Sequence, residues 1–485
     1  MTYIELHCHS AYSFLDGASQ PEEIAARAAD LGYPAIALTD HDGLYGSLEF
    51  AHAARALGVR AITGAEMTLA TDPATHVTLL VETARGYANL CRLLTRAHSL
   101  ERLRPRLETE HLLEASDGLV CLSGCARDGL ASRHPDEAAR LARALGKDRF
   151  LVELQRPYLR GDQKRNGRLR ELARSVGVRT VVTGNVHAHH PRRARLQDVL
   201  VAIREGTVVD GCESARRGNQ ESVLLSPAAA VDRFRDDPEA ISASVELAAR
   251  LEFDLTQELG YRYPDFSNEV EPADAALARA CWSAFAERYR HSTVRREAEA
   301  RLHEELTLIA ELGLSGFFLL HREVLELARE LAVKIRGASA ARQLLPPGRG
   351  RGSSVGSIVC YLTGLSHVDP VSSGLSLGRF LNRELATAPD IDLDFPRDIR
   401  AQLIVELINR YGEEHAALVA SFSTYRSRGA IREVGKALGL PSTELERLAL
   451  TADGRDARTV AAELGGLAGS DAKARSPRWR AFAEL

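Results

Sequence analysis

The sequence lacks the features of several large classes of protein. Its seven cysteines include no CxxC pair, which argues against a disulfide framework and a zinc knuckle. No segment reaches the roughly 18 uninterrupted apolar residues of a membrane span, and the start, MTYIELHCHS, has no apolar signal region. The formal net charge is only −4, so no global basicity indicates a polyanion partner. We therefore expect a cytoplasmic protein in which any nucleic-acid surface is local.

What is present is enough for an enzyme of several domains, because 485 residues exceed one compact core. Residues 1–205 repeat a strand followed by a helix: AIALTDH and RTVVTGN have the pattern of buried strands, and PEEIAARAADLG has helical spacing. This order predicts a parallel sheet or a barrel, with its chemistry in the loops after the strands. Residues 206–330 are mainly helical, and a break rich in Gly, Ser, Pro and Arg follows at 336–357.

Potential metal ligands fall at the ends of these predicted strands. His7 and His9 follow the first strand on one face, because side chains alternate along a strand. The other candidates at strand ends and in the loops are Asp16, His41, Glu66, His76, Cys125, Asn185 and His187. Such a set suits two or three ions of zinc, manganese or iron, which would activate water for a phosphoryl displacement. The alternative for a lone histidine is an ordinary polar residue, and we prefer it for His189 and His190.

Three of these segments carry a family resemblance. ELHCHSAYSFLDG, ALTDHDGLYG and TGAE resemble the signature segments of the polymerase and histidinol phosphatase (PHP) domain, a metal-dependent phosphoesterase fold built as a distorted (βα)7 barrel. The resemblance implies Zn²⁺, Mn²⁺ or Fe²⁺ bound by His7, His9, Asp16, His41, Glu66, His76, Cys125 and His187. Complete sites of the family usually have Asp where this chain has Asn185, and an amide binds a cation more weakly than a carboxylate. The domain is therefore expected to be a hydrolase or a metal-stiffened scaffold.

A glycine-rich segment from Gly350 to Ser357 precedes a predicted helix. Glycines allow close backbone approach, free N–H groups at a helix start attract phosphate, and Arg349 and Arg351 add positive charge. The segment has no Gly-Lys-Ser/Thr and so is not a Walker A loop. A flexible Gly/Ser linker is an equally good interpretation.

An acidic strand is predicted further along the chain. Asp390, Asp392 and Asp394 alternate with apolar residues, which gives the strand one acidic and one apolar face. Such a face could hold two Mg²⁺ ions that bridge a triphosphate and a 3′-hydroxyl. The alternative is an edge strand with a solvated acidic face.

Together these segments resemble a second family. The run from GRGRGSSVGS to PDIDLDF is similar to the palm of bacterial C-family replicative DNA polymerases, and RYGEEHAALVASFSTYRSRGAIREVGKALGLP resembles the end of the palm and the thumb, most closely in the error-prone, damage-tolerant branch. A PHP domain followed by a palm is characteristic of that family. The resemblance implies that Asp390 and Asp392 bind the catalytic Mg²⁺ ions, and that Asp394 is not one of the catalytic acids.

The same resemblance implies further contacts. The incoming nucleotide or primer end would meet Gly352, Ser353, Arg379 and Arg383, and the duplex would meet Arg426, Arg428, Arg432 and Lys436. For the last group a solvated helix face is the alternative interpretation.

The expected fold is α/β. It comprises a distorted (βα)7 PHP barrel over residues 1–205, a mainly helical connection and start of the palm over 206–330, a mixed α+β nucleotidyltransferase-like palm over 331–421, and a helical thumb over 422–485. The expected function is template-directed DNA synthesis in replication and in the repair of DNA damage, with primer-template DNA and dNTPs as partners.

The family's third catalytic aspartate follows the thumb, as do the parts that bind the sliding clamp and repair accessory proteins. We therefore expect this chain to be an incomplete polymerase that is inactive alone. The alternatives are a stand-alone PHP-type phosphoesterase or 3′-5′ exonuclease, and a non-catalytic DNA-binding scaffold.

Overall fold

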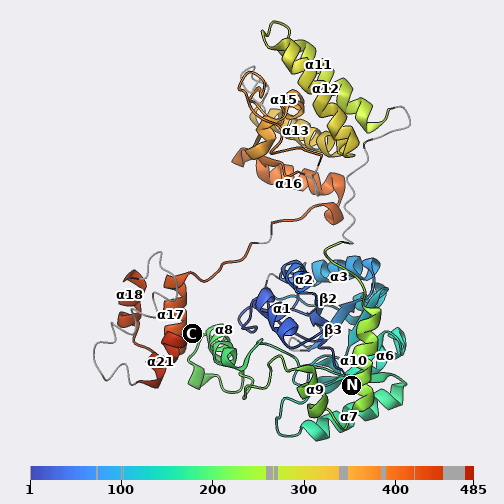
Figure 1. The fold of residues 1–485 in the computed structure, drawn as a ribbon, viewed down its shortest axis with the longest axis vertical. Coiled ribbons are helices and arrows are strands. Elements are labelled where there is room, and N and C mark those ends of the chain that lie inside the picture. Colours follow the sequence, from blue (N-terminus) through green and yellow to red (C-terminus); the bar gives the residue numbers. More distant parts are fainter. Residues whose placement is uncertain are drawn as a thin grey trace. The chain divides into compact units, whose positions relative to one another are not determined.

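The computed structural model describes residues 2–72, 75–99, 101, 103–257, 266, 271–337, 348–383, 389–419, 421–451 and 476–485. The chain forms two compact units (Figure 1). Unit 1 comprises Met1–Gly260 together with Ser423–Leu485, and unit 2 comprises Tyr261–Phe422. Residues 206–260, expected to form a connection, therefore belong to the first unit.

Unit 1 is built on a six-stranded sheet whose strand order follows the sequence. Its strands are β1 (Ala35–Leu38), β2 (Arg60–Thr68), β3 (His76–Val81), β4 (Leu119–Leu122), β5 (Phe150–Leu154) and β6 (Arg179–Val182). Neighbouring strands are parallel at β1–β2, β4–β5 and β5–β6. The sequence correctly predicts an α/β unit, whereas the expected (βα)7 barrel differs from this sheet in two respects.

The first difference is the direction of β3, which runs antiparallel to both β2 and β4. The connection between β2 and β3 spans only residues 69–75, too short for the crossover helix that a parallel neighbour requires. As a result, the first residue of β3, His76, lies at the same edge of the sheet as the carboxyl ends of the parallel strands.

The second difference concerns the first predicted strand, residues 3–6, which forms no ladder. It makes single parallel bridges instead, from Glu5 to Ile36 of β1 and from Cys8 to Val186 beyond β6. The segment therefore pairs with β1 on one side and with the chain that follows β6 on the other.

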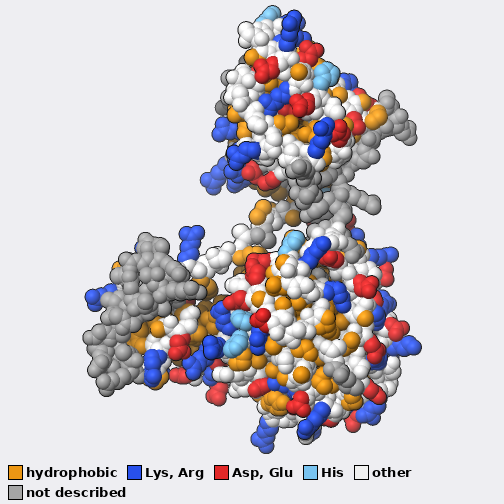
Figure 2. Space-filling model, in the orientation of Figure 1, with side chains coloured by type: hydrophobic (Ala, Val, Ile, Leu, Met, Phe, Trp, Pro, Cys, Tyr) orange, Lys and Arg blue, Asp and Glu red, His pale blue; other side chains and the backbone are white. Residues whose placement is uncertain are grey.

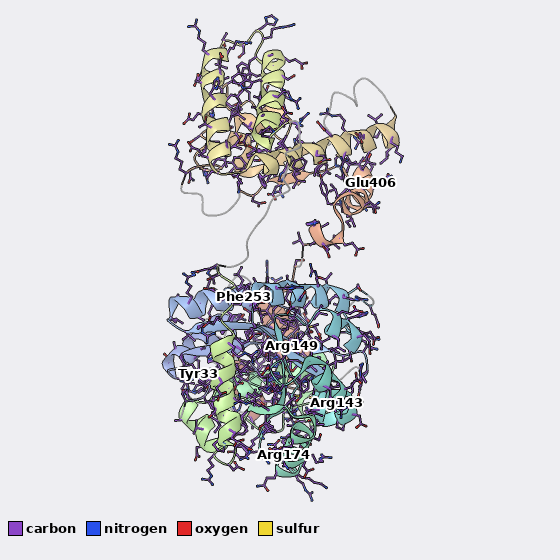
Figure 3. All side chains as sticks on the ribbon, turned by 90° about the vertical axis from the view of Figure 1, so that its right-hand side faces the viewer. Tyr33, Arg143, Arg149, Arg174, Phe253 and Glu406 are labelled. Carbon is purple, nitrogen blue, oxygen red and sulfur yellow. The ribbon has the colours of Figure 1, made fainter. Side chains whose placement is uncertain are left out.

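Helices cover the curled sheet, as Figure 1 shows. Those of residues 1–260 are α1 (Pro21–Asp30), α2 (Ser47–Ala56), α3 (Ala84–Ala97), α4 (Thr109–Glu114), α5 (Leu130–Arg133), α6 (Pro135–Leu145), α7 (Asp162–Val176), η1 (Pro191–Arg193), α8 (Ala194–Arg204), η2 (Val209–Gly211), α9 (Pro227–Arg233) and α10 (Pro238–Arg250). Alternate residues of a strand enter different cores: Ala35 and Ala37 lie in a core with Leu247 of α10, whereas Ile36 and Leu38 lie in a second, larger core that includes residues of α1, α2, α3 and α6. Tyr33 and Phe253, labelled in Figure 3, also belong to this second core.

The C-terminal helices of unit 1 are α17 (Ser427–Ala437), α18 (Ser442–Thr451) and α21 (Pro477–Glu484). They form a small core of their own, which includes Ile431, Leu445 and Phe482. Ala437 of α17 is also buried with Val199 and Ala202 of α8, so α17 packs against α8.

Unit 2 is largely helical. Its elements are α11 (Ala273–Arg288), α12 (Arg295–Glu311), α13 (Ser315–Arg336), β7 (Arg349–Arg351), η3 (Gly352–Gly356), α15 (Ile358–Thr363), β8 (Asp392–Asp394), α16 (Arg397–Tyr411) and η4 (Glu413–His415). The two strands form an antiparallel ribbon. The sequence ALVASF has the pattern of a strand, but its described residues, 417–419, 421 and 422, do not form one. No helix within the described ranges is long and apolar enough to span a membrane.

Candidate metal centre and nucleotide site

Glu66 of β2 is the centre of a buried histidine cluster in unit 1. His7 Nε2 lies 2.9 Å and His76 Nε2 3.1 Å from Glu66 Oε2, and His41 Nδ1 lies 2.5 Å from Glu66 Oε1. His9 Nε2 lies 3.8 Å from the same carboxylate. Because the carboxyl ends of parallel strands meet at one edge, ligands far apart in the sequence converge there.

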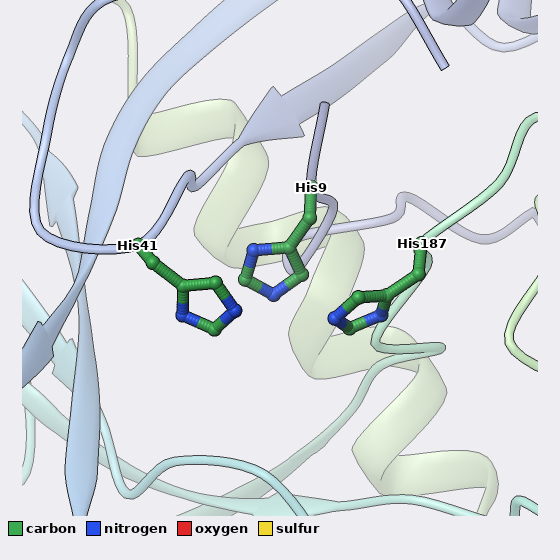
Figure 4. Close-up of side chains that lie close together, drawn as sticks. All are labelled: His9, His41 and His187. Carbon is green, nitrogen blue, oxygen red and sulfur yellow. The ribbon is translucent and has the colours of Figure 1, made fainter. Parts of the chain in front are cut away.

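Asp16 is the second carboxylate of the cluster. Its Oδ2 lies 3.2 Å from His41 Nε2 and 3.1 Å from His187 Nε2. His9 lies between these two histidines, with its ring centroid 4.4 Å from that of His41 and 4.3 Å from that of His187 (Figure 4). His41 thus bridges the two carboxylates.

Cys125 adjoins the cluster after β4. Its backbone N–H donates to His76 Nε2 at 3.2 Å. Burial and the Glu66 charge raise the pKa of the Cys125 thiol to about 11. The structure therefore places the residues that the sequence predicts in one cluster, which Cys125 joins through its backbone N–H while its Sγ accepts from the Asp128 N–H. By contrast, Ser19 contacts His189 and the backbone of Arg192 contacts His190, which agrees with a local polar role for both.

The donor set fits a divalent cation. Ligand atoms of His9, His41 and His187 lie within 4.8 Å of one another, as do those of His7, His9 and Glu66. His9 Nε2 is buried and has no hydrogen-bond partner among the described residues, an arrangement that costs free energy unless a ligand satisfies the nitrogen. Imidazole, carboxylate and thiol ligands together suit zinc, manganese or iron.

Charges act differently on different members of the cluster. Against the effect of burial, Glu153 raises the pKa of His7 to about 10 and Glu66 raises the pKa of His41, so a metal must displace a proton from each of these two rings. Burial alone would raise the pKa of Glu66, but His76 and His41 outweigh it and hold the pKa well below its usual range. Burial and Arg217 lower the pKa of His187 to about 4. The carboxylate is therefore ionised and His187 is neutral at pH 7, which are the forms that bind metals.

Several supporting residues were missed by the sequence analysis. Glu153 of β5 lies 2.6 Å from His7 Nδ1 and also contacts Thr183 and Gln155. Its only sequence signal is a single glutamate within the buried strand FLVEL. With Nδ1 facing Glu153, His7 presents Nε2 to the cluster, the orientation that a second carboxylate commonly imposes on a metal-binding histidine.

Asn185 fixes the ring of His187 through its backbone. Its φ of 48° is in the left-handed region, and its carbonyl oxygen accepts from His187 Nδ1 at 2.9 Å. The His187 Nε2 lone pair therefore faces the cluster. The Asn185 Oδ1 atom is buried without a hydrogen-bond partner among the described residues.

Arg217 also enters the cluster. One Nη donates to Asp16 Oδ2 at 2.9 Å and to His187 Nε2. Arg217 lies in the polar loop between η2 and α9, and nothing in the local sequence RRGNQ indicates that this side chain turns inward.

In unit 2 the glycine-rich segment pairs directly with the acidic strand. Gly350 is opposite Leu393 in the β7–β8 ribbon, and the Arg351 guanidinium lies 3.7 Å from Asp392 and 3.3 Å from Asp394. All three aspartates are exposed and Ile391 is buried, so the predicted separation of acidic and apolar faces is confirmed. Within the described ranges, three-ligand groupings occur only in the histidine cluster, so the aspartates alone do not form a closed metal site.

The first residues of α15 are bound by a side chain of unit 2. The backbone N–H groups of Ile358 and Val359 donate to the buried carboxylate of Glu305, as does the Ser357 hydroxyl. Arg301 pairs with Glu305 at 3.1 Å. Because an internal carboxylate already satisfies this helix start, an anion has no free donors there. Gly352 and Ser353 precede it and are exposed.

The remaining predicted basic residues lie on the surface. Arg379 is exposed, and Arg383 pairs with Glu311 at 3.0 Å. On α17, Arg432 pairs with Glu446 and Lys436 pairs with Glu433, both at 2.8 Å. Arg426 and Arg428 are exposed at the start of that helix. Figure 2 shows acidic and basic side chains interspersed on its visible face.

Comparison with known proteins agrees with both halves of this description. Residues 5–157 match the PHP domain, and residues 275–476 match the bacterial DNA polymerase III alpha NTPase domain.

Three similar relatives are all error-prone DNA polymerases. That of Symbiobacterium thermophilum is 35% identical over 477 residues, which cover 93% of this chain and 42% of the relative. That of Mycolicibacterium paratuberculosis is 36% identical over 457 residues, covering 90% of this chain and 40% of the relative. For Anaeromyxobacter dehalogenans the identity is 32% over 556 residues, covering 97% and 47%. The chain spans less than half the length of these relatives, and it belongs to the family of bacterial error-prone DNA polymerases related to the polymerase III alpha subunit.

Proposed function

We propose that unit 2 supplies part of the nucleotide and metal site of a DNA polymerase that adds dNTPs to a primer 3′-hydroxyl. The observation that carries this proposal is the β7–β8 ribbon, which places Arg351 and the following Gly352 beside Asp392. A glycine at this position lets the backbone approach a phosphate closely, and the φ of Gly352 is 76°.

In this proposal Asp390 and Asp392 hold Mg²⁺, which would stabilise the charge on the triphosphate while the 3′-hydroxyl displaces pyrophosphate. Arg351 would exchange its carboxylate partners for phosphate oxygens, since a guanidinium suits either. Ser353, Arg379 and Arg383 are the further candidates for nucleotide contacts.

Nucleotide binding tests this site directly. We expect the chain to bind a fluorescent dNTP with Mg²⁺, and Asp390→Asn and Asp392→Asn to weaken binding about tenfold. Asp394→Asn is the matched control, because Asp394 contacts Arg351 at 3.3 Å but is not a proposed metal ligand. Equal affinity of all variants would contradict the proposal.

Primer extension needs more than this site. Because the relatives are more than twice as long as the part matched here, we propose that extension requires further regions of the family and that this chain alone extends no primer. Template-dependent incorporation by the chain, abolished by Asp390→Ala, would place the complete activity within these residues and overturn that part of the proposal.

Duplex DNA is the proposed partner of the start of α17. Both Arg426 and Arg428 are exposed there. We expect affinity for duplex DNA to fall with salt, and Arg426→Gln with Arg428→Gln to lower the slope of that dependence by about one per lost phosphate contact. An unchanged slope in the double variant would exclude this surface.

A second candidate function belongs to unit 1. The convergence of buried histidines on Glu66 and Asp16 favours a metal-dependent phosphoesterase or 3′-5′ exonuclease. A bound metal would supply an activated water there, and its binding would release a proton from His7 and from His41, whose pKa values the neighbouring carboxylates raise. We expect metal binding and hydrolysis of a phosphodiester, both lost in His9→Ala. Protein that binds no zinc, manganese or iron at neutral pH would exclude this function.

A further inference from the structure

The histidine cluster has two unequal halves. Around Glu66 the contacts come from histidines, whereas around Asp16 they also come from cationic and amide groups of the chain between residues 194 and 217. Gln197 Nε2 donates to Asp16 Oδ1 at 3.3 Å, and Arg204 Nη1 lies 3.6 Å from the same oxygen. Arg217 approaches the other oxygen.

Arg217 contacts the same two atoms that a metal ion would bind in this half of the cluster. Its Nη contacts Asp16 Oδ2 and His187 Nε2 at once. His187 Nδ1 is held by the Asn185 carbonyl, so Nε2 is the only ring atom available for a metal. The guanidinium thus occupies the lone pairs of two predicted ligands.

The loop that carries Arg217 is fixed at its backbone. Arg127 donates to the carbonyl oxygens of Ser214, Ala215 and Arg216. A cavity of about 300 Å³ adjoins the loop, and Arg217, Asn185 and Gly184 line it together with Gln155. The Arg217 side chain therefore has space to withdraw while its backbone stays in place.

We propose that Arg217 is a built-in cation that competes with a divalent metal for the Asp16–His187 half of the cluster. The Glu66 half fills first, and the Asp16 half fills only when Arg217 moves into the adjoining cavity. This inference rests on the proposed metal centre of unit 1. The Arg217 charge would balance the Asp16 carboxylate when no metal ion occupies that half, so the cluster need not hold as many ions as its ligands could bind.

Metal counting tests the proposal. The protein would be titrated with Mn²⁺ or Zn²⁺ by calorimetry, and bound metal measured after gel filtration. We expect Arg217→Met to hold about one more ion per chain than wild type, or to bind its weakest ion about tenfold more tightly, because a competing cation is gone. Arg217→Gln serves as a second variant, and circular dichroism checks the fold of each.

Arg204→Met is the matched control, since Arg204 contacts Asp16 but not His187. We expect it to change metal affinity much less than Arg217→Met. An equal effect of both variants would indicate a general charge effect and overturn the proposal. Equal metal content and affinity in wild type and Arg217→Met would also overturn it while leaving the metal centre intact. Absence of metal from every variant would instead exclude the centre itself.

Discussion

At the scale of single residues, Asn185 is the most informative departure from a complete metal site. Its side-chain oxygen is buried without a partner among the described residues, beside a cluster that is rich in histidine. Asp at this position would add a negative charge that a bound metal ion would offset, whereas in the metal-free protein the nearby Arg217 is already paired with Asp16.

We therefore predict opposite effects of Asn185→Asp in the two states. With chelator the variant should unfold more easily than wild type, by about 1–3 kcal/mol, because a buried carboxylate has no partner. With saturating Mn²⁺ its melting temperature should rise more than that of wild type. Melting curves with and without metal measure both effects, and a variant that melts like wild type in both conditions would refute the prediction.

Glu153 acts on the cluster through His7. Glu153→Gln keeps the size of the side chain but removes the charge that faces His7 Nδ1 at 2.6 Å. We predict metal affinity about 10–100-fold weaker, as for other carboxylates behind a metal-binding histidine. Glu137→Gln is the control, since Glu137 pairs with Arg140 at the surface and its loss should leave the metal titration unchanged.

At the scale of elements, the antiparallel direction of β3 decides which residues reach the cluster. His76 begins this strand, and in a parallel strand its first residue would lie at the opposite edge of the sheet from the other ligands. The short hairpin before β3 therefore recruits a ligand from the start of a strand instead of its end.

In unit 2 the element that holds the glycine-rich segment is the start of α15. Glu305→Gln should destabilise this unit by about 3 kcal/mol, because it breaks a buried ion pair and weakens three hydrogen bonds to residues 357–359. Urea unfolding followed by circular dichroism measures the loss. Glu304 is exposed on α12, the helix that also carries Glu305. Glu304→Gln should therefore change the free energy of unfolding by less than about 0.5 kcal/mol.

At the scale of the whole molecule, each unit has its own hydrophobic core. We predict two thermal transitions by calorimetry. Added metal should raise the midpoint temperature of the unit 1 transition only, because a ligand stabilises the unit that binds it. Glu305→Gln should lower the midpoint temperature of the unit 2 transition only. A single transition that shifts as a whole in both experiments would contradict this independence.

The sequence predicted most members of the cluster because residues such as His41, Glu66 and His76 lie at or near strand ends, where the local pattern is readable. It did not predict Arg217 or Glu153, because a polar loop and an apolar strand give no sign of the partner that each contacts. ALVASF was wrongly predicted as a strand over its described residues: Leu418 and Val419 are 82% and 93% exposed. Apolar and β-branched residues favour a strand only when a neighbouring strand is there to pair with.

The pairing of residues 7–9 with Val186 also sets an order of events during synthesis. The first histidines leave the ribosome early and β1 soon follows, but Val186 on their other side emerges only after about 180 further residues, which takes on the order of ten seconds at bacterial rates. Until then, His7 and His9 have neither His187 nor Arg217 beside them. The cluster is therefore completed late, by a contact between the beginning and the end of the sheet, and the Asp16–His187 half of the proposed metal centre cannot form before that closure.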